Sequence, residues 1–403
     1  MRLLHTADWH FGRTLEGRSR QGEHEAFADE LVRIAEEESI DAVLIAGDVY
    51  DSVNPPAEAE TLFYETLQRL SGSGRRPVAV IAGNHDHPDR LSAAGPLALA
   101  HGVQLAGLPT SDVLQLGSAR TGELAMLYAL PYPSESRLRE LLSAEADEEM
   151  LQLAYSERIA ALVRGAEERF REGTIHLIMS HLYALGGAVS DSERPIEVGG
   201  AYTVDPAAFG TKAQYVALGH LHRPQAVRLS EGDTSGRRVR YSGSPLAFSF
   251  SEAGQAKSVS IVELAPGGVP AVEEIPLSSG RPLVRWRAAG GLAEVYRWID
   301  EGRDARAWIE LEVCVTEALS MEQIQTLRRR HDGIALIRPV FAAAQDATSL
   351  RAERSLPIDE MFRRFYTRQT GGAEADEALV KLFLELIAGD EEETGETEGA
   401  MRL

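Results

Sequence analysis

The 403-residue sequence predicts an α/β protein of layered sheets and helices with more than one domain. Three observations lead to this fold class. Short apolar runs alternate with helix-like stretches over the first hundred residues, a pattern typical of a parallel sheet. Further apolar runs after residue 124 predict a second sheet. A strand–helix pattern starts again beyond the glycine- and proline-containing stretch 265–270, and it predicts a small additional module.

The first sheet is predicted from three apolar runs. Residues 2–7, 42–46 and 78–82 are expected to be strands, and the stretches 23–39 and 56–70 between them have helical spacing. Each apolar run ends in a polar cluster. In open α/β sheets the ligand site lies at the carboxyl ends of the strands, so these clusters are the first place to look for chemistry.

The second sheet follows in the same way. Strands are expected at 124–130, 174–179, 215–218, 239–242 and 258–264, with a helix at 148–172. Together the two sheets and their helices define a predicted first domain over residues 1–275.

A small α/β domain is expected over residues 281–344. It is predicted from strand, helix, strand, helix and strand patterns at 282–286, 292–299, 307–315, 321–330 and 334–340. Two short amphipathic helices are expected within 356–389, and the acidic residues 390–403 are expected to be disordered.

Composition excludes several classes of protein. There are 41 basic and 62 acidic side chains, which give a net charge of −21 and argue against a simple basic-patch nucleic-acid binder or a membrane-surface protein. The single cysteine, Cys314, excludes an intrachain disulfide and a cysteine-based zinc site. No apolar run approaches membrane length, so the cytoplasm is the expected location.

Five polar clusters directly follow predicted strands. They are Asp8-Trp9-His10, Gly47-Asp48-Val49-Tyr50-Asp51, Gly83-Asn84-His85-Asp86, Ser180-His181 and Gly219-His220-Leu221-His222. Taken singly each is as typical of an ordinary turn or a buried histidine as of a site. As an ordered set they indicate a metal centre, since mixed oxygen and imidazole donors suit manganese, iron or zinc.

Spacing supports convergence in two of the clusters. In Asp8-x-His10 and in His220-x-His222 the donors are two residues apart. On a continuing strand that spacing points both side chains to the same side. Each pair can therefore reach one metal centre.

The ordered set resembles the calcineurin-like metallophosphoesterase family, whose pattern is D-x-H, G-D-x-x-D, G-N-H-[DE], H and G-H-x-H. The resemblance covers about residues 2–264. It implies a two-sheet β-sandwich flanked by helices and two divalent metal ions, most often Mn²⁺, with Mg²⁺ as an alternative.

The resemblance also implies a role for each motif residue. One ion would be held by Asp8, His10, Asp48 and His222, and the other by Asp48, Asn84, His181 and His220. His85 would act on the leaving group or the transition state as the catalytic residue. Asp51 and Asp86 would lie outside the ligand set and orient His85 or a ligand; many archaeal and eukaryotic relatives carry histidine at the Asp51 position.

Within the family, the length and the segment Tyr241-Ser242-Gly243-Ser244-Pro245 are most similar to bacterial DNA-repair nuclease subunits. That resemblance implies an ATP-dependent double-strand exonuclease and single-strand or hairpin endonuclease acting in DNA repair, recombination and replication. It implies a coiled-coil ABC-type ATPase partner that uses the ATP, docked on residues 358–388, although these helices could instead fold back on the small domain. A homodimer within a heterotetramer is implied through residues 56–70 and 89–99, whose apolar stripes could equally face the chain's own sheet.

Two other functions remain open at this stage. A small-substrate phosphoesterase, such as a cyclic-nucleotide or nucleotide-sugar phosphodiesterase, would not need the module after residue 281. A non-enzymatic scaffold would usually have lost ligands, and none is missing. For the nuclease, five arginines near the motifs are candidate DNA contacts or ordinary surface residues: Arg13, Arg18, Arg20, Arg90 and Arg223.

Overall fold

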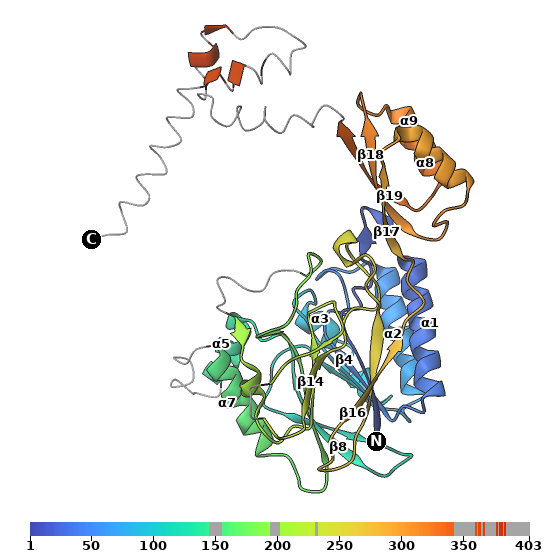
Figure 1. The fold of residues 1–403 in the computed structure, drawn as a ribbon. Coiled ribbons are helices and arrows are strands. Elements are labelled where there is room, and N and C mark those ends of the chain that lie inside the picture. Colours follow the sequence, from blue (N-terminus) through green and yellow to red (C-terminus); the bar gives the residue numbers. More distant parts are fainter. Residues whose placement is uncertain are drawn as a thin grey trace. The chain divides into compact units, whose positions relative to one another are not determined.

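Two six-stranded sheets pack face to face between two layers of helices (Figure 1). The structure is a computed structural model. It describes residues 1–144, 155–193, 202–229 and 233–341, together with some residues between 359 and 383. The predicted α/β architecture with two sheets is confirmed.

The first sheet has the strand order β16-β15-β1-β4-β5-β6. The strands β1 (Arg2–Thr6), β4 (Ala42–Ala46), β5 (Val78–Ile81) and β6 (Val103–Ala106) run parallel, and β15 (Ser258–Glu263) and β16 (Ala271–Pro276) are antiparallel to their neighbours. The helices α1 (Gln21–Glu37) and α2 (Ala57–Ser71) connect the parallel strands, as the helical spacing predicted.

The second sheet has the order β13-β14-β12-β9-β8-β7. Its strands are β13 (Gln225–Ala226), β14 (Arg238–Tyr241), β12 (Tyr215–Gly219), β9 (Ile175–His181), β8 (Leu124–Leu130) and β7 (Val113–Gly117). Helices α5 (Glu135–Ala144) and α7 (Tyr155–Glu167) lie on its outer side, shown in green in Figure 1. The strand expected at 258–264 belongs instead to the first sheet, where it pairs with β1.

Successive side chains along the strands of the first sheet point to opposite faces, so one face packs against the second sheet and the other against the helices. In β1 the side chain of Leu3 lies in the apolar layer between the sheets, and Leu4 packs toward α1 and α2. The same alternation places Leu44 between the sheets and Val43 and Ile45 under the helices. Strands buried on both faces have continuous apolar sequences, as these strands do.

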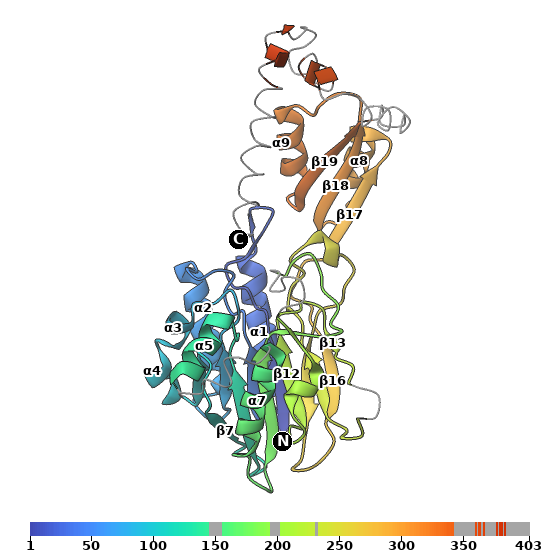
Figure 2. The same ribbon diagram turned by 90° about the vertical axis from the view of Figure 1, so that its left-hand side faces the viewer.

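A three-stranded sheet forms the small module, which consists of the elements from β17 to β19. The order is β17 (Leu283–Ala288), β18 (Trp308–Val315) and β19 (Ile334–Phe341), and the helices α8 (Gly291–Asp300) and α9 (Met321–Arg330) connect the strands, as Figure 2 shows in orange. A capping box between Ser320 and Gln323 fixes the start of α9. All five elements were predicted from the sequence pattern.

By its internal contacts the chain divides into two units, Met1–Val313 with Ser320–Arg338, and Cys314–Leu319 with Pro339–Leu403. In the second unit the rings of Phe362 and Phe383 stack at 4.0 Å, so the two C-terminal helical stretches contact each other there. Most of the predicted helical segment 356–389 and all of the acidic segment 390–403 lie outside the described residues.

The apolar stripe expected to face a second subunit is mostly part of the core. Leu62, Phe63, Leu67 and Leu91 are buried against the first sheet. The predicted helix 89–99 is two short helices, α3 (Pro88–Ser92) and α4 (Gly95–Leu99), and on the latter Leu97 is 76% exposed. For these four residues the structure therefore supports the alternative in which the stripes face the chain's own sheet.

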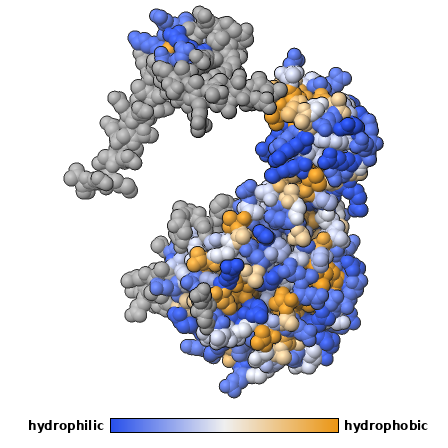
Figure 3. Space-filling model, viewed as in Figure 1, coloured by the Kyte–Doolittle hydropathy of each residue, from blue (hydrophilic) through white to orange (hydrophobic). Residues whose placement is uncertain are grey.

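Hydrophilic side chains dominate the face of the molecule drawn in Figure 3, with apolar residues scattered among them. Within the described part of the chain, no helix is both long and apolar enough to span a bilayer.

Candidate metal centre

The five polar clusters meet where strands of both sheets end. Asp8 follows β1, Asp48 follows β4 and Asn84 follows β5 in the first sheet, whereas His181 ends β9 and His220 follows β12 in the second. Gly219 and His181 are register partners across β9 and β12. The backbone N–H of His220 donates to the carboxylate of Asp8, so residues 212 positions apart in the sequence are brought to one place.

Several of these side chains are oriented by residues in the left-handed backbone conformation and not by a continuing strand. The φ angles are 55° at Asp8, 47° at His10, 49° at Asp48 and 107° at His220. Non-glycine residues rarely adopt such angles, and they gather at functional sites where surrounding structure enforces them. Asp8 and His10 do converge, together with His222, through tight turns after the strands, whereas His220 faces Asn84.

Two glycines allow this close packing. A Cβ atom on Gly83 would collide with the carboxylate and backbone of Asp48, and one on Gly219 would collide with the carbonyl oxygen of Ala46. The loops after β4, β5 and β12 can therefore approach each other only with glycine at these positions.

One donor group consists of Asp8, His10, Asp48 and His222. The Nε2 atoms of His10 and His222 lie 3.2 Å apart, and His10 Nε2 lies 3.6 Å from Asp48 Oδ2. Ligand atoms of Asp8, His10 and His222 all lie within 4.8 Å of one another. Two buried imidazole nitrogens and carboxylate oxygens facing one point are a donor set suited to a divalent transition-metal ion.

The second donor group consists of Asp48, Asn84, His181 and His220. Asn84 Oδ1 lies 2.9 Å from His181 Nε2 and 3.3 Å from His220 Nδ1. His181 Nε2 lies 3.4 Å from Asp48 Oδ2. The buried Asn84 Nδ2 has no hydrogen-bond partner, whereas its oxygen faces the histidines, as a ligand oxygen would.

Electrostatics show that this cluster requires compensating positive charge. Burial raises the pKa of Asp8 well above its usual value. Burial also opposes ionisation of Asp48, but His181, His85 and His10 hold its pKa well below the usual range. Burial would lower the pKa of His181, yet Asp48 and Asp8 raise it to about 9. A cation between these donors would supply the charge that a proton on His181 otherwise provides, so the residues present fit divalent ions.

Outer partners orient three of the histidines, two through hydrogen bonds and His10 through an ion-pair contact. His181 Nδ1 donates to the carbonyl oxygen of Ala46 at 2.9 Å, which leaves Nε2 for the centre. His10 Nδ1 lies 3.4 Å from Asp51 Oδ1, and His222 Nδ1 lies 2.5 Å from Ser192 Oγ. Partners of this kind fix the ring orientation of metal-binding histidines.

His85 lies at the edge of the cluster. Its backbone N–H donates to Asp48 Oδ1 at 2.9 Å, and its Nδ1–H donates to the carbonyl oxygen of Asp51 at 2.7 Å. Its Nε2 lies 4.0 Å from Asp48 Oδ2. The ring therefore presents Nε2 toward the site while Nδ1 is occupied.

The two remaining acidic residues have different surroundings. Asp51 contacts both His10, through its carboxylate, and His85, through its carbonyl. The carboxylate of Asp86 instead accepts three backbone N–H bonds, from Val49, Tyr50 and Gly83. Asp86 thus ties the loop after β4 to the loop after β5 rather than orienting the ring of His85.

The five candidate arginines differ in their surroundings. Arg13 lies at the site, 3.6 Å from Asp51 through Nη1, and Nη2 donates to the carbonyl oxygen of Ser192 at 3.0 Å. Arg223 is exposed beside His222. Arg18 donates to the carbonyl oxygen of Ile334, and Arg90 pairs with Glu60 and Asn54.

Arg20 does not face a phosphate-binding surface. Arg20 is 1% exposed, and its guanidinium makes a bidentate ion pair with the carboxylate of Glu23, with N–O distances of 2.7 and 2.6 Å. A third N–H group donates to the carbonyl oxygen of Ala247. The structure therefore removes Arg20 from the candidate DNA contacts, because its donors are satisfied inside the protein.

Several residues at the site carried no sequence signal. Glu193 accepts the His222 backbone N–H at 2.9 Å, and the buried ion pair between Glu252 and Lys257 lies behind the same histidine, with Lys257 Nζ donating to the His222 carbonyl oxygen. Phe248 packs edge-on against the rings of His10 and His222. None of these residues belongs to a spaced motif, and only the nearby segment 241–245 pointed to this region.

Comparison with known proteins agrees with this site. The model of the calcineurin-like phosphoesterase family matches residues 1–224. The SbcD subunit of the nuclease SbcCD from Bacillus subtilis strain 168 is 52% identical, over 98% of this chain and 99% of its own length. The chain belongs to the SbcD family of calcineurin-like phosphoesterases.

Other SbcD relatives are more distant. The SbcD subunit of Rhodobacter capsulatus is 38% identical over 72% of each chain, and that of Escherichia coli K12 is 29% identical over 97% of this chain and all of its own. A second family model, SbcD_C, described as the Type 5 capsule protein repressor C-terminal domain, matches residues 279–370. SbcD membership makes this chain a metal-dependent phosphodiesterase of the nuclease type, and it favours that function over a small-substrate phosphoesterase or a scaffold without activity.

Proposed function

We propose that this SbcD-family chain hydrolyses phosphodiester bonds of DNA with two divalent metal ions that share Asp48. The observation that carries the proposal is the position of Asp48 Oδ2, which lies 3.6 Å from His10 Nε2 in one donor group and 3.4 Å from His181 Nε2 in the other. The proposed ligands are Asp8, His10, Asp48 and His222 for one ion, and Asp48, Asn84, His181 and His220 for the other.

The chain's own residues would divide the remaining work. When bound, a pair of divalent ions activates a water molecule and neutralises charge on a phosphate. His85, with Nδ1 fixed on the Asp51 carbonyl and Nε2 free, would deliver a proton to the leaving oxygen. Arg13 would hold a phosphate oxygen, because its guanidinium is already positioned at the site by Asp51 and Ser192. We retain the exposed Arg223 as a second candidate DNA contact.

The shared position of Asp48 is testable by metal analysis. Asp48→Ala should lose both ions and all DNA hydrolysis, since the carboxylate belongs to both donor groups. Asp29→Ala is a matched control, because Asp29 is 70% exposed on the outer surface of α1. A full load of two ions in Asp48→Ala, measured by elemental analysis, would refute the ligand assignment.

We propose Mn²⁺ as the preferred ion. Four imidazoles with carboxylate and amide oxygens form a donor set of intermediate softness, which suits Mn²⁺ better than Mg²⁺. The test is a comparison of single-stranded DNA cleavage by metal-free protein reloaded with each ion. Higher activity with Mg²⁺ at equal occupancy would reverse the assignment.

We propose that an SbcC-like coiled-coil ABC-type ATPase is the partner and that it docks on residues 358–388. Support comes from the relatives' name, which designates one component of a complex, and from the amphipathic pattern of that segment. Deleting everything after Ser355 should keep Mn²⁺-dependent cleavage of single-stranded DNA and abolish co-purification with the ATPase. Undiminished co-purification would locate the docking surface elsewhere. Because the proposed substrate is DNA and the partner uses ATP, we place the complex in the cytoplasm.

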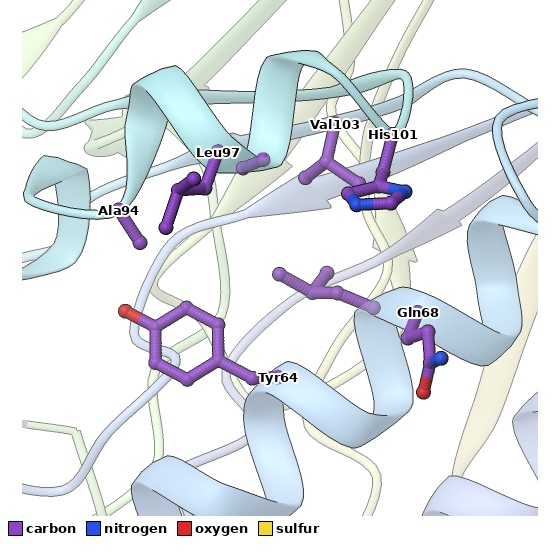
Figure 4. A pocket seen from close by; sticks show the side chains of 8 residues that line it. Tyr64, Gln68, Ala94, Leu97, His101 and Val103 are labelled. Carbon is purple, nitrogen blue, oxygen red and sulfur yellow. The ribbon is translucent and has the colours of Figure 1, made fainter.

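We propose a homodimer through the exposed surface of α2 and α4, within a heterotetramer with the ATPase. Figure 4 shows Tyr64 of α2 facing Ala94 and Leu97 across a pocket, with Gln68 of α2 at the end of the pocket near His101. The pocket has a volume of about 300 Å³. Tyr64, Leu97 and Leu99 are 38%, 76% and 63% exposed, an unusual apolar grouping on a protein of this charge. Leu97→Glu should shift the protein toward monomer in sedimentation analysis, whereas Val269→Glu, at an apolar residue that is 61% exposed, should not. A wild-type chain that sediments only as a monomer at high concentration would refute the dimer.

A further inference from the structure

The side chain of Phe248 contacts three groups of the candidate metal centre at once. Its ring centroid lies 5.1 Å from that of His10 and 5.5 Å from that of His222, with interplanar angles of 80° and 71°. The guanidinium carbon of Arg13 lies 4.7 Å from the same ring centroid. Phe248 is 5% exposed, so the position of this ring constrains the rings and the guanidinium around it.

The backbone around Phe248 is fixed from the side away from the centre. Arg20 donates to the carbonyl oxygen of Ala247 at 2.5 Å, and the N–H of Phe248 donates to Glu252 Oε1 at 3.2 Å. Arg20 is in turn fixed by its two bonds to Glu23. The ring therefore depends on a buried ion pair that makes no contact with the metal ligands themselves.

The same ion pair is bonded to the small module and to the segment just before it. Trp308 Nε1 donates to Glu23 Oε1 at 2.8 Å, and the backbone N–H of Arg281 donates to Glu23 Oε2 at 2.7 Å. Glu23 is 8% exposed, so a donor lost from this carboxylate is not simply replaced by bulk water.

A second, apolar connection runs parallel to the polar one. Phe250, two residues after Phe248, packs in a cluster with Leu15 and with Leu283, Trp308 and Ala335 of the small module. Ser249 between the two phenylalanines is extended, with φ −142° and ψ 152°. One short loop thus has one aromatic ring in the metal centre and the next in the contact with the small module.

We propose that Phe248 is a positioning residue for the His10–His222 side of the metal centre, and that the small module sets its position through Trp308, Glu23 and Arg20. This inference rests on the proposed function, because it takes His10 and His222 as ligands of one ion. It adds that the module is part of the apparatus that shapes this ion's site. Bonds that orient metal ligands from outside typically change metal affinity or activity 10–100-fold when they are lost.

The test compares two tryptophan variants of the full chain. Trp308→Phe keeps an aromatic ring in the apolar cluster but removes the donor to Glu23. Trp286→Phe is the matched control, because Trp286 lies in the same module and its Nε1 donates to Asp304 at 2.8 Å without reaching Glu23. Phe248→Leu perturbs the ring directly. Free Mn²⁺ is followed by electron paramagnetic resonance during titration, and the melting temperature of each metal-free variant is measured alongside.

We expect Phe248→Leu to weaken one of two Mn²⁺ ions about 10-fold or more and to leave the other unchanged. Trp308→Phe should weaken the same ion by a smaller factor, and Trp286→Phe should bind both ions as the wild type does. Equal Mn²⁺ affinities for Trp308→Phe and Trp286→Phe would overturn the proposed link between the small module and the metal site. The link would also be overturned if the binding of both ions were weakened equally, in proportion to a lowered melting temperature. If Trp308→Phe does not fold, Glu23→Gln gives the same comparison. A wild-type chain that does not bind two Mn²⁺ ions would instead refute the proposed function.

Discussion

His85→Ala should separate metal binding from catalysis. The Nε2 atom of His85 is 4.0 Å from the nearest oxygen of Asp48, and its Nδ1 is committed to the Asp51 carbonyl. We therefore predict that the side chain contributes no ligand and that its removal leaves two Mn²⁺ ions bound. A positioned general acid contributes about 10²–10⁴-fold to rate, which corresponds to about 3–5 kcal/mol of transition-state stabilisation.

The assay measures two quantities on the same preparation. Elemental analysis gives the number of bound ions, and cleavage of a labelled single-stranded DNA gives the rate under saturating Mn²⁺. His87→Ala is the control, since His87 is an exposed histidine two residues away at the start of α3. The reasoning would be refuted by a variant that loses an ion, or by one that retains both ions and cleaves within about threefold of the wild type.

Three further predictions follow from the surroundings of the centre. Arg20→Ala should destabilise the fold by about 3–5 kcal/mol in denaturant unfolding, because it leaves the buried Glu23 carboxylate without its ion-pair partner; Arg33→Ala, at a half-exposed arginine of α1, should cost less than about 1 kcal/mol. Burial opposes ionisation of Glu23, but Arg20, Arg281 and Trp308 lower its pKa below the ordinary 4.5. The ionised carboxylate therefore stabilises the fold fully above pH 4.5, and this stabilisation is lost as pH falls further. The unfolding free energy of Glu23→Gln should fall less steeply with decreasing pH than that of the wild type, and the same slope for both proteins would contradict the prediction. Gly83→Ala should lose metal binding, because the added methyl group must displace Asp48, whereas Gly254→Ala, which meets no atom within 4 Å but has a φ of 81°, should lose stability only.

Sequence reasoning located the centre well because its residues are tied to strand ends. A donor that must lie at the carboxyl end of a buried strand follows an apolar run, so Asp8, Asp48 and Asn84 could be recognised as members of an ordered set, although none of them is distinctive alone. The helices and strands of the small module were found for the same reason, since their periodicity is strong and their connections are short.

What the sequence could not provide depends on partners distant in the chain. The burial of Arg20 is decided by Ala247, 227 residues away, and by Glu23, which also serves Trp308. Helical spacing in α2 shows that Leu62 and Phe63 share an apolar face, but it does not say whether that face meets the chain's own sheet or a second subunit. Ser192 and Phe248 reach the site from loops whose course is set only by the packed fold.

The origin of the donors in both sheets has a consequence for synthesis of the protein. His10 and His222 face each other across 212 positions of sequence, and His220 closes on Asp8 over the same span. During translation, the donors from the first sheet, Asp8, Asp48 and Asn84, emerge from the ribosome long before the histidines after β12. A nascent chain therefore cannot assemble either complete donor group until β12 and the histidines that follow it have been made. Cleavage activity is therefore expected only after the chain has been synthesised past His222.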